Sequence, residues 1–296
     1  MLYSCYGLTI SSEIPLPLAA AEGNRRADFE VCDVATEAPP LAPIGTFGGV
    51  NGERVPWGFA VEDEEVNFWF GDAGTMRVDC DRRVIEADGS GRRPRVAACV
   101  VSTGLACLVS TMGYLVLHAA SVVRDGSAVA ICGRSGRGKS TAAVSLALAR
   151  RGWSVLHDDV TVLSLDHRAQ PGPPYAELRA DTARGLGIPC AGGKVTVPLG
   201  AVNGAPMRAL VLLEPRGLAP AARILGPAEA AARLGCDAGW WGPLTPRGRT
   251  ARFAMIADLV DAVPCLAWSP PEGIATATAA LCEILEDGEV SSTQLD

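Results

Sequence analysis

The sequence predicts an α/β domain that follows a smaller β-rich domain. Strand-forming runs separated by turn residues fill the first part of the chain, up to about residue 90. Beyond residue 93, apolar runs alternate between helical and strand character. The glycine-rich segment GRSGRGKS (133–140) lies between one expected strand and one expected helix of this second part. We therefore divide the chain into a β-rich domain, 1–92, and an α/β domain, 93–296.

Clusters of β-branched and aromatic residues between glycine, aspartate and asparagine turns predict the first domain. The expected strands lie in FEVCDV (29–34), GFAVEDEEVNFWF (58–70) and TMRVDC (75–80). The proline-rich segment EAPPLAPIG (37–45) predicts a loop. This part contains no catalytic motif, and we interpret it as a small sheet domain that packs on a neighbour or contributes to recognition.

The second domain opens with VAACVVSTGLACLVSTMGYLVL (96–117), an uncharged run of 22 residues. Its length would suffice to cross a bilayer. However, it contains serines, threonines and two glycines, and its end has the character of a strand. We therefore expect a buried helix that leads into a core strand. The elements expected in order are a helix near 94–112, a strand near 114–123, a strand at 128–132, a helix at about 139–151, a strand or hairpin at 154–165, strands at 194–199 and 207–215, and helices at 251–263 and 274–287.

Composition excludes several classes of function. A net charge of -7 and a pI near 5.1 argue against a protein that coats nucleic acid. The three histidines are too scattered to suggest a metal cluster, and the ten cysteines contain no C-x-x-C pair. Most of these cysteines lie among small apolar residues, and no secretory signal opens the chain. We expect a cytoplasmic protein with free thiols and no nucleic-acid or membrane partner, and homo-oligomerisation stays open.

The segment GRSGRGKS fits the pattern G-x-x-x-x-G-K-[ST] of phosphate-binding loops. Its glycines allow several backbone N–H groups to point at one phosphate, next to the N-terminus of a helix. Lys139 is expected to reach the β- and γ-phosphates, and Ser140 to offer its hydroxyl to Mg²⁺. The predicted nucleotide-binding residues are Gly133, Arg134, Ser135, Gly136, Arg137, Gly138, Lys139, Ser140 and Thr141.

Two adjacent aspartates, Asp158 and Asp159, follow the next expected strand, 19 residues after Lys139. Ligands of parallel α/β sheets bind outside the carboxyl ends of the strands, so this pair is expected beside the loop. One carboxylate can hold Mg²⁺ while the other accepts the proton of an attacking hydroxyl. The structural alternative is an aspartate pair that caps a turn. His118 ends the preceding apolar run and is a further candidate for a functional role. The alternative interpretation is that its side chain only packs against the neighbouring strand.

The segments HAASVV (118–123), ICGRSGRGKST (131–141) and GWSVLHDDV (152–160) together resemble the HPr kinase family, bacterial kinases that phosphorylate a protein serine. The resemblance covers about residues 115–165. It implies a kinase that uses ATP and Mg²⁺, with a phosphate-binding-loop kinase fold in the second domain. It also implies catalytic roles for His118, Lys139 and Asp158. Asp158 would be the base that activates the serine hydroxyl, and Asp159 would lie with Ser140 at the metal.

The resemblance is stronger to one branch of this family. Bifunctional members carry a glutamate before an arginine-glycine segment, whereas ADTARGLGI (180–188) has Thr182 there, so the reverse dephosphorylation is not implied. YGLTISSEIPLPL (6–18), PGPPYAELRADTARGLG (171–187) and GKVTVPL (193–199) are similar to shorter HPr-kinase-like enzymes of gene clusters for ribosomally made peptides. In that branch, lasso-peptide kinases phosphorylate a carboxy-terminal serine of the precursor, which implies a peptide partner.

Three other functions stay open from the sequence: an HPr-type protein serine kinase, a small-molecule hydroxyl kinase, and a non-catalytic nucleotide-dependent switch. No LSGGQ-like or N-K-x-D segment points to a transporter ATPase or a GTPase. Weaker candidates for contacts with phosphate or an acidic peptide are Lys194, Arg247, Arg249 and Arg252. Trp240 and Trp241 are candidates for a peptide groove, with packing as the alternative.

Overall fold

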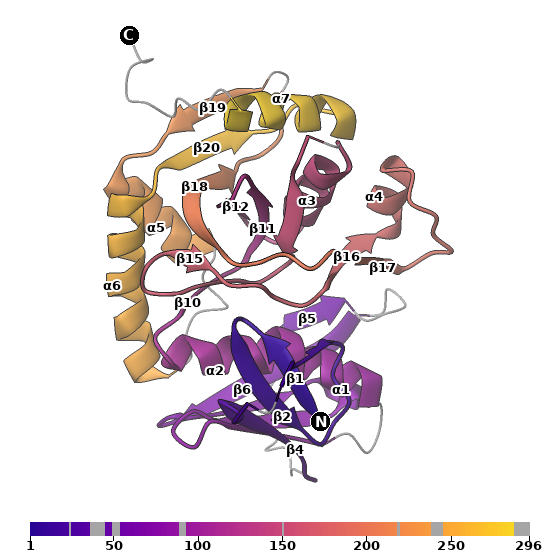
Figure 1. The fold of residues 1–296 in the computed structure, drawn as a ribbon, viewed down its shortest axis with the longest axis vertical. Coiled ribbons are helices and arrows are strands. Elements are labelled where there is room, and N and C mark those ends of the chain that lie inside the picture. Colours follow the sequence, from indigo (N-terminus) through magenta and orange to yellow (C-terminus); the bar gives the residue numbers. More distant parts are fainter. Residues whose placement is uncertain are drawn as a thin grey trace.

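The structure, a computed structural model, describes residues 1–23, 25–35, 45–48, 54–88, 93–149, 151–217, 220–237 and 245–286. Within these residues the chain is a mixed α/β protein with two large sheets, one above the other in Figure 1. The predicted α/β class is therefore confirmed. Trp240, Trp241 and the carboxy-terminal tail lie outside the described residues.

The first sheet has nine strands in the order β3-β1-β2-β4-β9-β8-β7-β6-β5. It is mixed, because β2, β4 and β9 run parallel while the other neighbours are antiparallel. Alternating burial along β7, with Val66 and Phe68 inside, fits a sheet that has one face in the core. The strands are β1 (Leu2–Cys5), β2 (Leu8–Ser12), β3 (Ala19–Ala20), β4 (Phe29–Asp33), β5 (Gly45–Gly48), β6 (Arg54–Glu62), β7 (Glu65–Trp69), β8 (Thr75–Asp79) and β9 (Val84–Ala87), with a 3-10 turn η1 (Gly71–Ala73) before β8.

A continuous helical segment covers the buried face of this sheet and lies between the two sheets in Figure 1. It consists of α1 (Arg93–Cys99), a π-helical turn η2 (Val100–Gly104) and α2 (Leu105–Thr111). A Cβ on Gly104 would come within 2.7 Å of the Met76 sulfur, so glycine permits this close packing. The uncharged run is thus a buried helix, as expected. No helix in the described part of the chain is long and apolar enough to span a membrane.

The second sheet contains the strand order β13-β11-β12-β18-β20-β19. Its strands β12, β18 and β20 are parallel, and β10, β14 and β15 extend it from the β18 side. The strands are β10 (Leu115–Leu117), β11 (Ala119–Arg124), β12 (Ser127–Cys132), β13 (Ser154–His157), β14 (Thr161–Leu163), β15 (Arg168–Ala169), β18 (Ala205–Leu213), β19 (Ala221–Ile224) and β20 (Cys265–Ser269).

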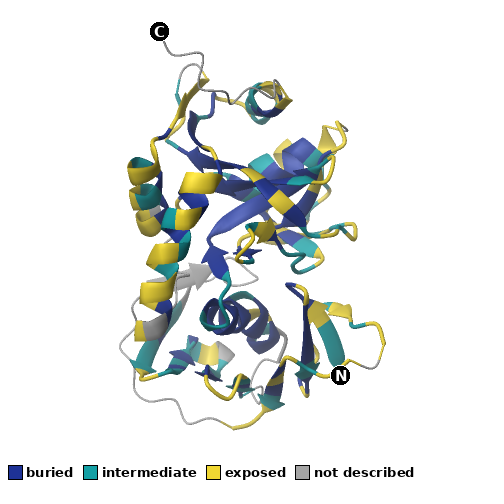
Figure 2. Ribbon diagram, turned by 60° about the vertical axis from the view of Figure 1, so that its left-hand side comes forward, coloured by how far each residue is buried: buried dark blue, intermediate teal, exposed yellow. Residues whose placement is uncertain are grey.

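Helices cover both faces of this second sheet. Helices α3 (Lys139–Leu148) and α7 (Ile274–Glu286) share one buried cluster, and α5 (Pro227–Asp237) and α6 (Pro246–Ala262) share the other. Figure 2 shows buried residues concentrated in the central strands and exposed residues on the outer sides of the helices. Beside α3 lies a two-stranded sheet of β16 (Tyr175–Arg179) and β17 (Lys194–Pro198), joined through α4 (Ala180–Gly185).

Two sequence expectations need correction. The strand near 114–123 is interrupted at His118, because β10 pairs with β14 whereas β11 pairs with β12 and β13. The segment 154–165 is not a hairpin, since β13 and β14 pair with these separate strands and not with each other. Between them Asp159 adopts a left-handed conformation, with φ 69°, that redirects the chain. The division after residue 92 stays a prediction, although the helix after it packs with the first sheet.

Candidate functional site

The glycine-rich segment joins the end of β12 to the start of α3. Gly133, Gly136 and Gly138 have φ values of 147°, 80° and 98°, which side-chain-bearing residues rarely adopt. A Cβ on Gly133 would also come within 3.2 Å of the Leu213 Cβ. The residues between Gly133 and Gly138 are exposed, so the loop and the N-terminus of the ten-residue helix α3 face solvent. This geometry suits an anion such as a phosphate group.

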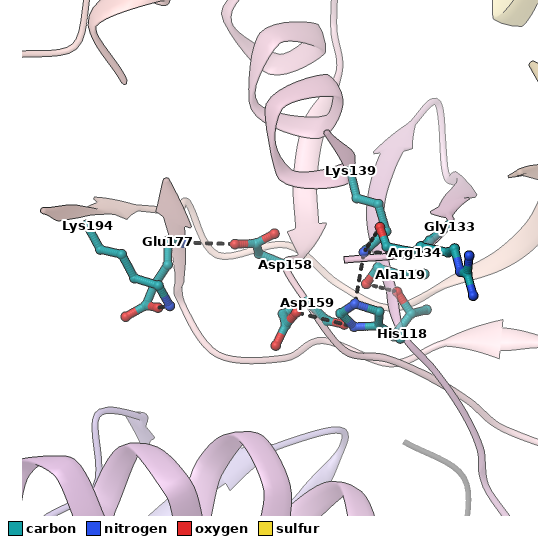
Figure 3. A network of polar contacts seen from close by, with 10 residues as sticks. His118, Ala119, Gly133, Arg134, Lys139, Asp158, Asp159, Glu177 and Lys194 are labelled. Carbon is teal, nitrogen blue, oxygen red and sulfur yellow. Dashed lines mark hydrogen bonds and ion pairs between the residues drawn. The ribbon is translucent and has the colours of Figure 1, made fainter. Parts of the chain in front are cut away.

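Lys139, the first residue of α3, turns back under the loop (Figure 3). Its side chain is buried, and Nζ donates hydrogen bonds to the carbonyl oxygens of Gly133 at 2.9 Å and Arg134 at 3.3 Å. Nζ also lies 2.9 Å from His118 Nε2. Burial lowers the pKa of Lys139, while Asp159 opposes this change. These three partners use all three ammonium protons, so a phosphate can contact Lys139 only by displacing one partner. The contact with the Arg134 carbonyl oxygen is the longest of the three.

His118 is buried at the break between β10 and β11 and links Lys139 to the aspartate pair. Burial, together with a smaller effect of the Lys139 charge, lowers the pKa of His118 to about 4. The ring is therefore neutral at pH 7. Since Lys139 can only donate, Nε2 accepts from it, and Nδ1–H donates to the Asp159 carbonyl oxygen at 3.0 Å.

Asp158 lies at the carboxyl end of β13, with its carboxylate near the Ser140 hydroxyl. Oδ2 accepts a hydrogen bond from the Glu177 backbone N–H at 2.8 Å. Oδ1 is buried and has no hydrogen-bond partner in the described part of the chain. Burial raises the pKa of Asp158 to about 6; the Ser140 hydroxyl lowers it and Asp159 raises it. A buried, unsatisfied carboxylate oxygen near a serine hydroxyl is a donor set that fits Mg²⁺.

Asp159 faces the other way, toward His118, and 52% of its side chain is exposed. Its Oδ1 lies 3.3 Å from His118 Nδ1. The surrounding protein raises the pKa of Asp159, and the positive charges of Lys139 and Lys194 oppose the increase. Because half of the side chain is exposed, the carboxylate is accessible to a second substrate. The structure thus brings together His118, Lys139 and both aspartates, as the sequence predicted.

Lys194 also belongs to this site. It starts β17, and its Nζ lies 2.5 Å from Glu177 Oε2 on the paired strand β16 (Figure 3). Arg249 and Arg252 lie instead on α6, which packs on the face of the sheet opposite to α3. The side chain of Arg247 is outside the described residues. Of the weaker sequence candidates with described side chains, only Lys194 lies near the aspartates.

The sequence missed a buried support behind the aspartates. Tyr6, in the turn between β1 and β2 of the first sheet, stacks on His157 with ring centroids 5.5 Å apart. Its backbone N–H donates to the Pro171 carbonyl oxygen at 2.7 Å. His157 directly precedes Asp158, and burial lowers its pKa to about 3, so it is neutral. The first sheet thus holds the strand end that carries both carboxylates, and no local sequence pattern signals this long-range contact.

The parts of the chain that the structure describes contain no group of three or more His, Cys, Asp or Glu residues placed to hold a metal ion. Ser140 and Asp158 lie where they could bind a divalent cation together with the phosphates of a bound nucleotide. Mg²⁺ commonly binds through one or two carboxylates together with substrate phosphates and water. The residues present fit that mode of binding.

Comparison with known proteins gives a distant structural likeness. No protein-family model matches the chain, and no curated protein matches it. Among solved structures, the Hpr(Ser) kinase/phosphatase from Coxiella burnetii is similar over 59% of this chain and 96% of that chain, with 16% identity and a TM-score of 0.33. This likeness is too distant to transfer residue roles. The chemistry proposed below rests on the residues of this chain.

Proposed function

We propose that this protein is a Mg²⁺- and ATP-dependent kinase that phosphorylates a serine hydroxyl of a peptide. The acceptor we propose is the carboxy-terminal serine of a ribosomally made precursor of the lasso-peptide type. The observation that supports a kinase best is the connected set Lys139–His118–Asp159 beside Asp158 and Ser140. It combines a cation for the transferred phosphoryl group, a carboxylate open to an acceptor, and a carboxylate free to bind metal.

Nucleotide binding is assigned to the loop and the start of α3. The backbone N–H groups of residues 133–141 cradle the phosphates, and Lys139 contacts the β- and γ-phosphates after it releases the Arg134 carbonyl. Ser140 and Asp158 hold Mg²⁺, which when bound offsets the negative charge of the phosphates. His118 holds Lys139 and the Asp159 backbone in place, so most of the catalytic effect comes from positioning and electrostatics.

We exchange the roles that the sequence suggested for the two aspartates. Asp158 Oδ1 is enclosed near Ser140, where an incoming peptide cannot reach it. Asp159 has half of its side chain exposed and lies beside Lys139. Asp159 therefore accepts the proton of the serine hydroxyl as that oxygen bonds to the γ-phosphorus. The bond from the γ-phosphorus to the bridging oxygen breaks at the same time, and ADP leaves.

The small sheet beside the site supports a peptide acceptor. In the described residues β16 and β17 pair only with each other, so each strand has an edge that an extended peptide can join. Lys194 lies where β17 begins, with 40% of its side chain exposed. Its ammonium group can pair with the carboxylate of a terminal serine held near Asp159. This feature favours a peptide terminus over an HPr-type protein loop or a small hydroxyl compound.

The direct test is the intact mass of the short peptide encoded beside the gene, after incubation with the protein, ATP and Mg²⁺. HPr and glycerol are offered in parallel as the other acceptor classes. We expect a gain of phosphoryl mass at the terminal serine, lost with Lys139→Ala and kept with Asp125→Asn, a control on an aspartate whose side chain is 86% exposed. Phosphorylation of HPr or glycerol alone would assign those acceptor classes, and no transfer with nucleotide bound would favour the switch.

Variants of the two aspartates separate their roles. Asp159→Asn should lower kcat by about 10²- to 10⁴-fold while leaving Mg²⁺ and ATP binding intact. Asp158→Asn should instead raise the Mg²⁺ concentration needed for half-maximal rate. The reverse pattern would restore the assignment made from the sequence. Lys194→Gln should raise KM for a peptide with a free carboxylate and not for the same peptide amidated at its end.

A further inference from the structure

A pocket lies beside the glycine-rich loop, on the side of α3 that faces α7. Its open space, counted out into the solvent at its mouth, is about 430 Å³. Its walls come from the loop, α3, the carboxyl ends of the parallel strands β18 and β20, and the start of α7. The lining is largely apolar and includes Leu213, Trp268 and Ala277. None of the residues proposed for metal binding or proton transfer lines it.

The position of this pocket relative to the aspartates follows from the helix geometry. Thr141 and Ser145 are one helical turn apart, so they share the side of α3 that lines the pocket. Ser140, near Asp158, lies on a different side of the same turn. A triphosphate that crosses the N-terminus of α3 with its γ-phosphate at Asp159 therefore directs its other end toward α7. Arg137 and Arg216, both exposed, lie at the pocket near that path.

We infer that this pocket binds the base of the nucleotide and that it prefers adenine to guanine. The inference rests on the proposed ATP-binding function and adds the residues that recognise the base. The largely apolar walls suit a purine ring. The polar groups of the walls decide which purine fits.

Three hydroxyl-bearing residues line the pocket, and two of them, Ser145 and Thr278, have hydroxyl groups that can act as hydrogen-bond acceptors. Ser145 Oγ donates to the Ala142 carbonyl oxygen at 3.0 Å, and Thr278 Oγ1 donates to the Ile274 carbonyl oxygen at 2.7 Å. Each hydroxyl proton is thus engaged within its own helix, while lone pairs of the hydroxyl oxygen stay available to accept a hydrogen bond from a ligand. An exocyclic amino group, as in adenine, can donate to these oxygens. The C6 carbonyl of guanine would need a donor there, and a hydroxyl that turned to supply one would give up its helix bond.

Trp268 contributes aromatic surface to the pocket. This residue is 2% exposed and forms part of the pocket wall. An aromatic side chain in the wall suits the packing of a purine ring.

Calorimetric titration with Mg·ATP, Mg·GTP and Mg·tripolyphosphate tests the inference on the full chain. Ala277→Leu places a larger side chain in the pocket, and Ala279→Leu adds the same group at an exposed position of α7 outside it. We expect Ala277→Leu to weaken ATP binding about 10-fold or more and to leave tripolyphosphate binding unchanged, with no effect from Ala279→Leu. The wild-type protein should bind ATP about 10-fold more tightly than GTP, and Thr278→Val should narrow this ratio.

The outcomes separate this inference from the proposed kinase activity. Unchanged ATP affinity in Ala277→Leu places the base elsewhere, and an equal loss for ATP and tripolyphosphate shows that the pocket only supports the loop; both overturn the inference. Equal wild-type affinities for ATP and GTP overturn the adenine preference. Because these are binding measurements, a protein that shows the expected pattern but transfers no phosphate keeps the base site and loses the kinase proposal.

Discussion

Substitution of Gly172 by alanine tests how tightly the strand end that carries the aspartates is held. A Cβ on Gly172 would lie 2.2 Å from His157 Nδ1 and 2.3 Å from its Cε1, so the ring or the backbone must move. His157 cannot move easily, because it is fully buried, contacts the Gln170 carbonyl oxygen through Nε2, and stacks on Tyr6. Overpacking of a rigid core costs about 1–3 kcal/mol. We expect Gly172→Ala to lower the free energy of unfolding by that amount.

Urea unfolding followed by tryptophan fluorescence measures this loss, with Gly200→Ala as the matched control. Gly200 has nothing within 4 Å of the added methyl group and no positive φ, so its substitution should change stability by less than about 0.5 kcal/mol. In a His157→Ala background the ring is absent, and Gly172→Ala should then cost much less. An equal cost with and without the ring, or no difference from Gly200→Ala, would refute the reasoning.

Two further predictions concern protonation and thiol exposure. Burial raises the pKa of Asp158 to about 6 from an ordinary value of 3.8, so the folded state binds this proton more tightly than the unfolded state. The proton therefore contributes its full share of stability below pH 4, and this share is lost as the pH rises through 6. Without Mg²⁺, Asp158→Asn should therefore gain stability over wild type by about 1–3 kcal/mol more at pH 7 than at pH 4 in urea unfolding; a constant difference would contradict the shift. Among the ten free cysteines only Cys236 is exposed, so a thiol reagent should modify one group rapidly, Cys32 and Cys190 slowly, and the seven buried thiols only after unfolding; several fast thiols would contradict this packing.

Local patterns in the sequence were sufficient for the α/β class and for the loop that carries Lys139. The glycines of that loop and the apolar spacing of α3 are short-range signals, and the structure has the loop between a strand and a helix. The helical segment that runs from α1 to α2 was also predicted, because its core-facing residues lie in one continuous stretch of the sequence. The π-helical turn in its middle contains Gly104, which packs closely against Met76, and no local pattern specifies this contact.

The relation between β13 and β14 could not be predicted, because it depends on partners far along the chain. The sequence HDDVTVL suggests a hairpin, yet the left-handed conformation of Asp159 separates the two strands. The contact of Asp158 with the Glu177 backbone likewise depends on β16, which has no strong sequence signal. For this reason the roles that we propose for the two aspartates needed the structure, whereas their presence near the loop could be predicted from the sequence.

The choice between lysine and arginine adds a compositional argument for the site. The chain contains 26 lysines and arginines, and its only lysines are Lys139 and Lys194. Both lie at the aspartate pair, where burial raises the pKa of Asp159 and the charges of both lysines oppose that increase. A compact ammonium group fits the enclosed space among Gly133, Arg134 and His118, where a planar guanidinium with five donors would leave protons unsatisfied. A chain that uses arginine almost everywhere else thus has lysine at the two positions where we place the phosphoryl group and the peptide carboxylate.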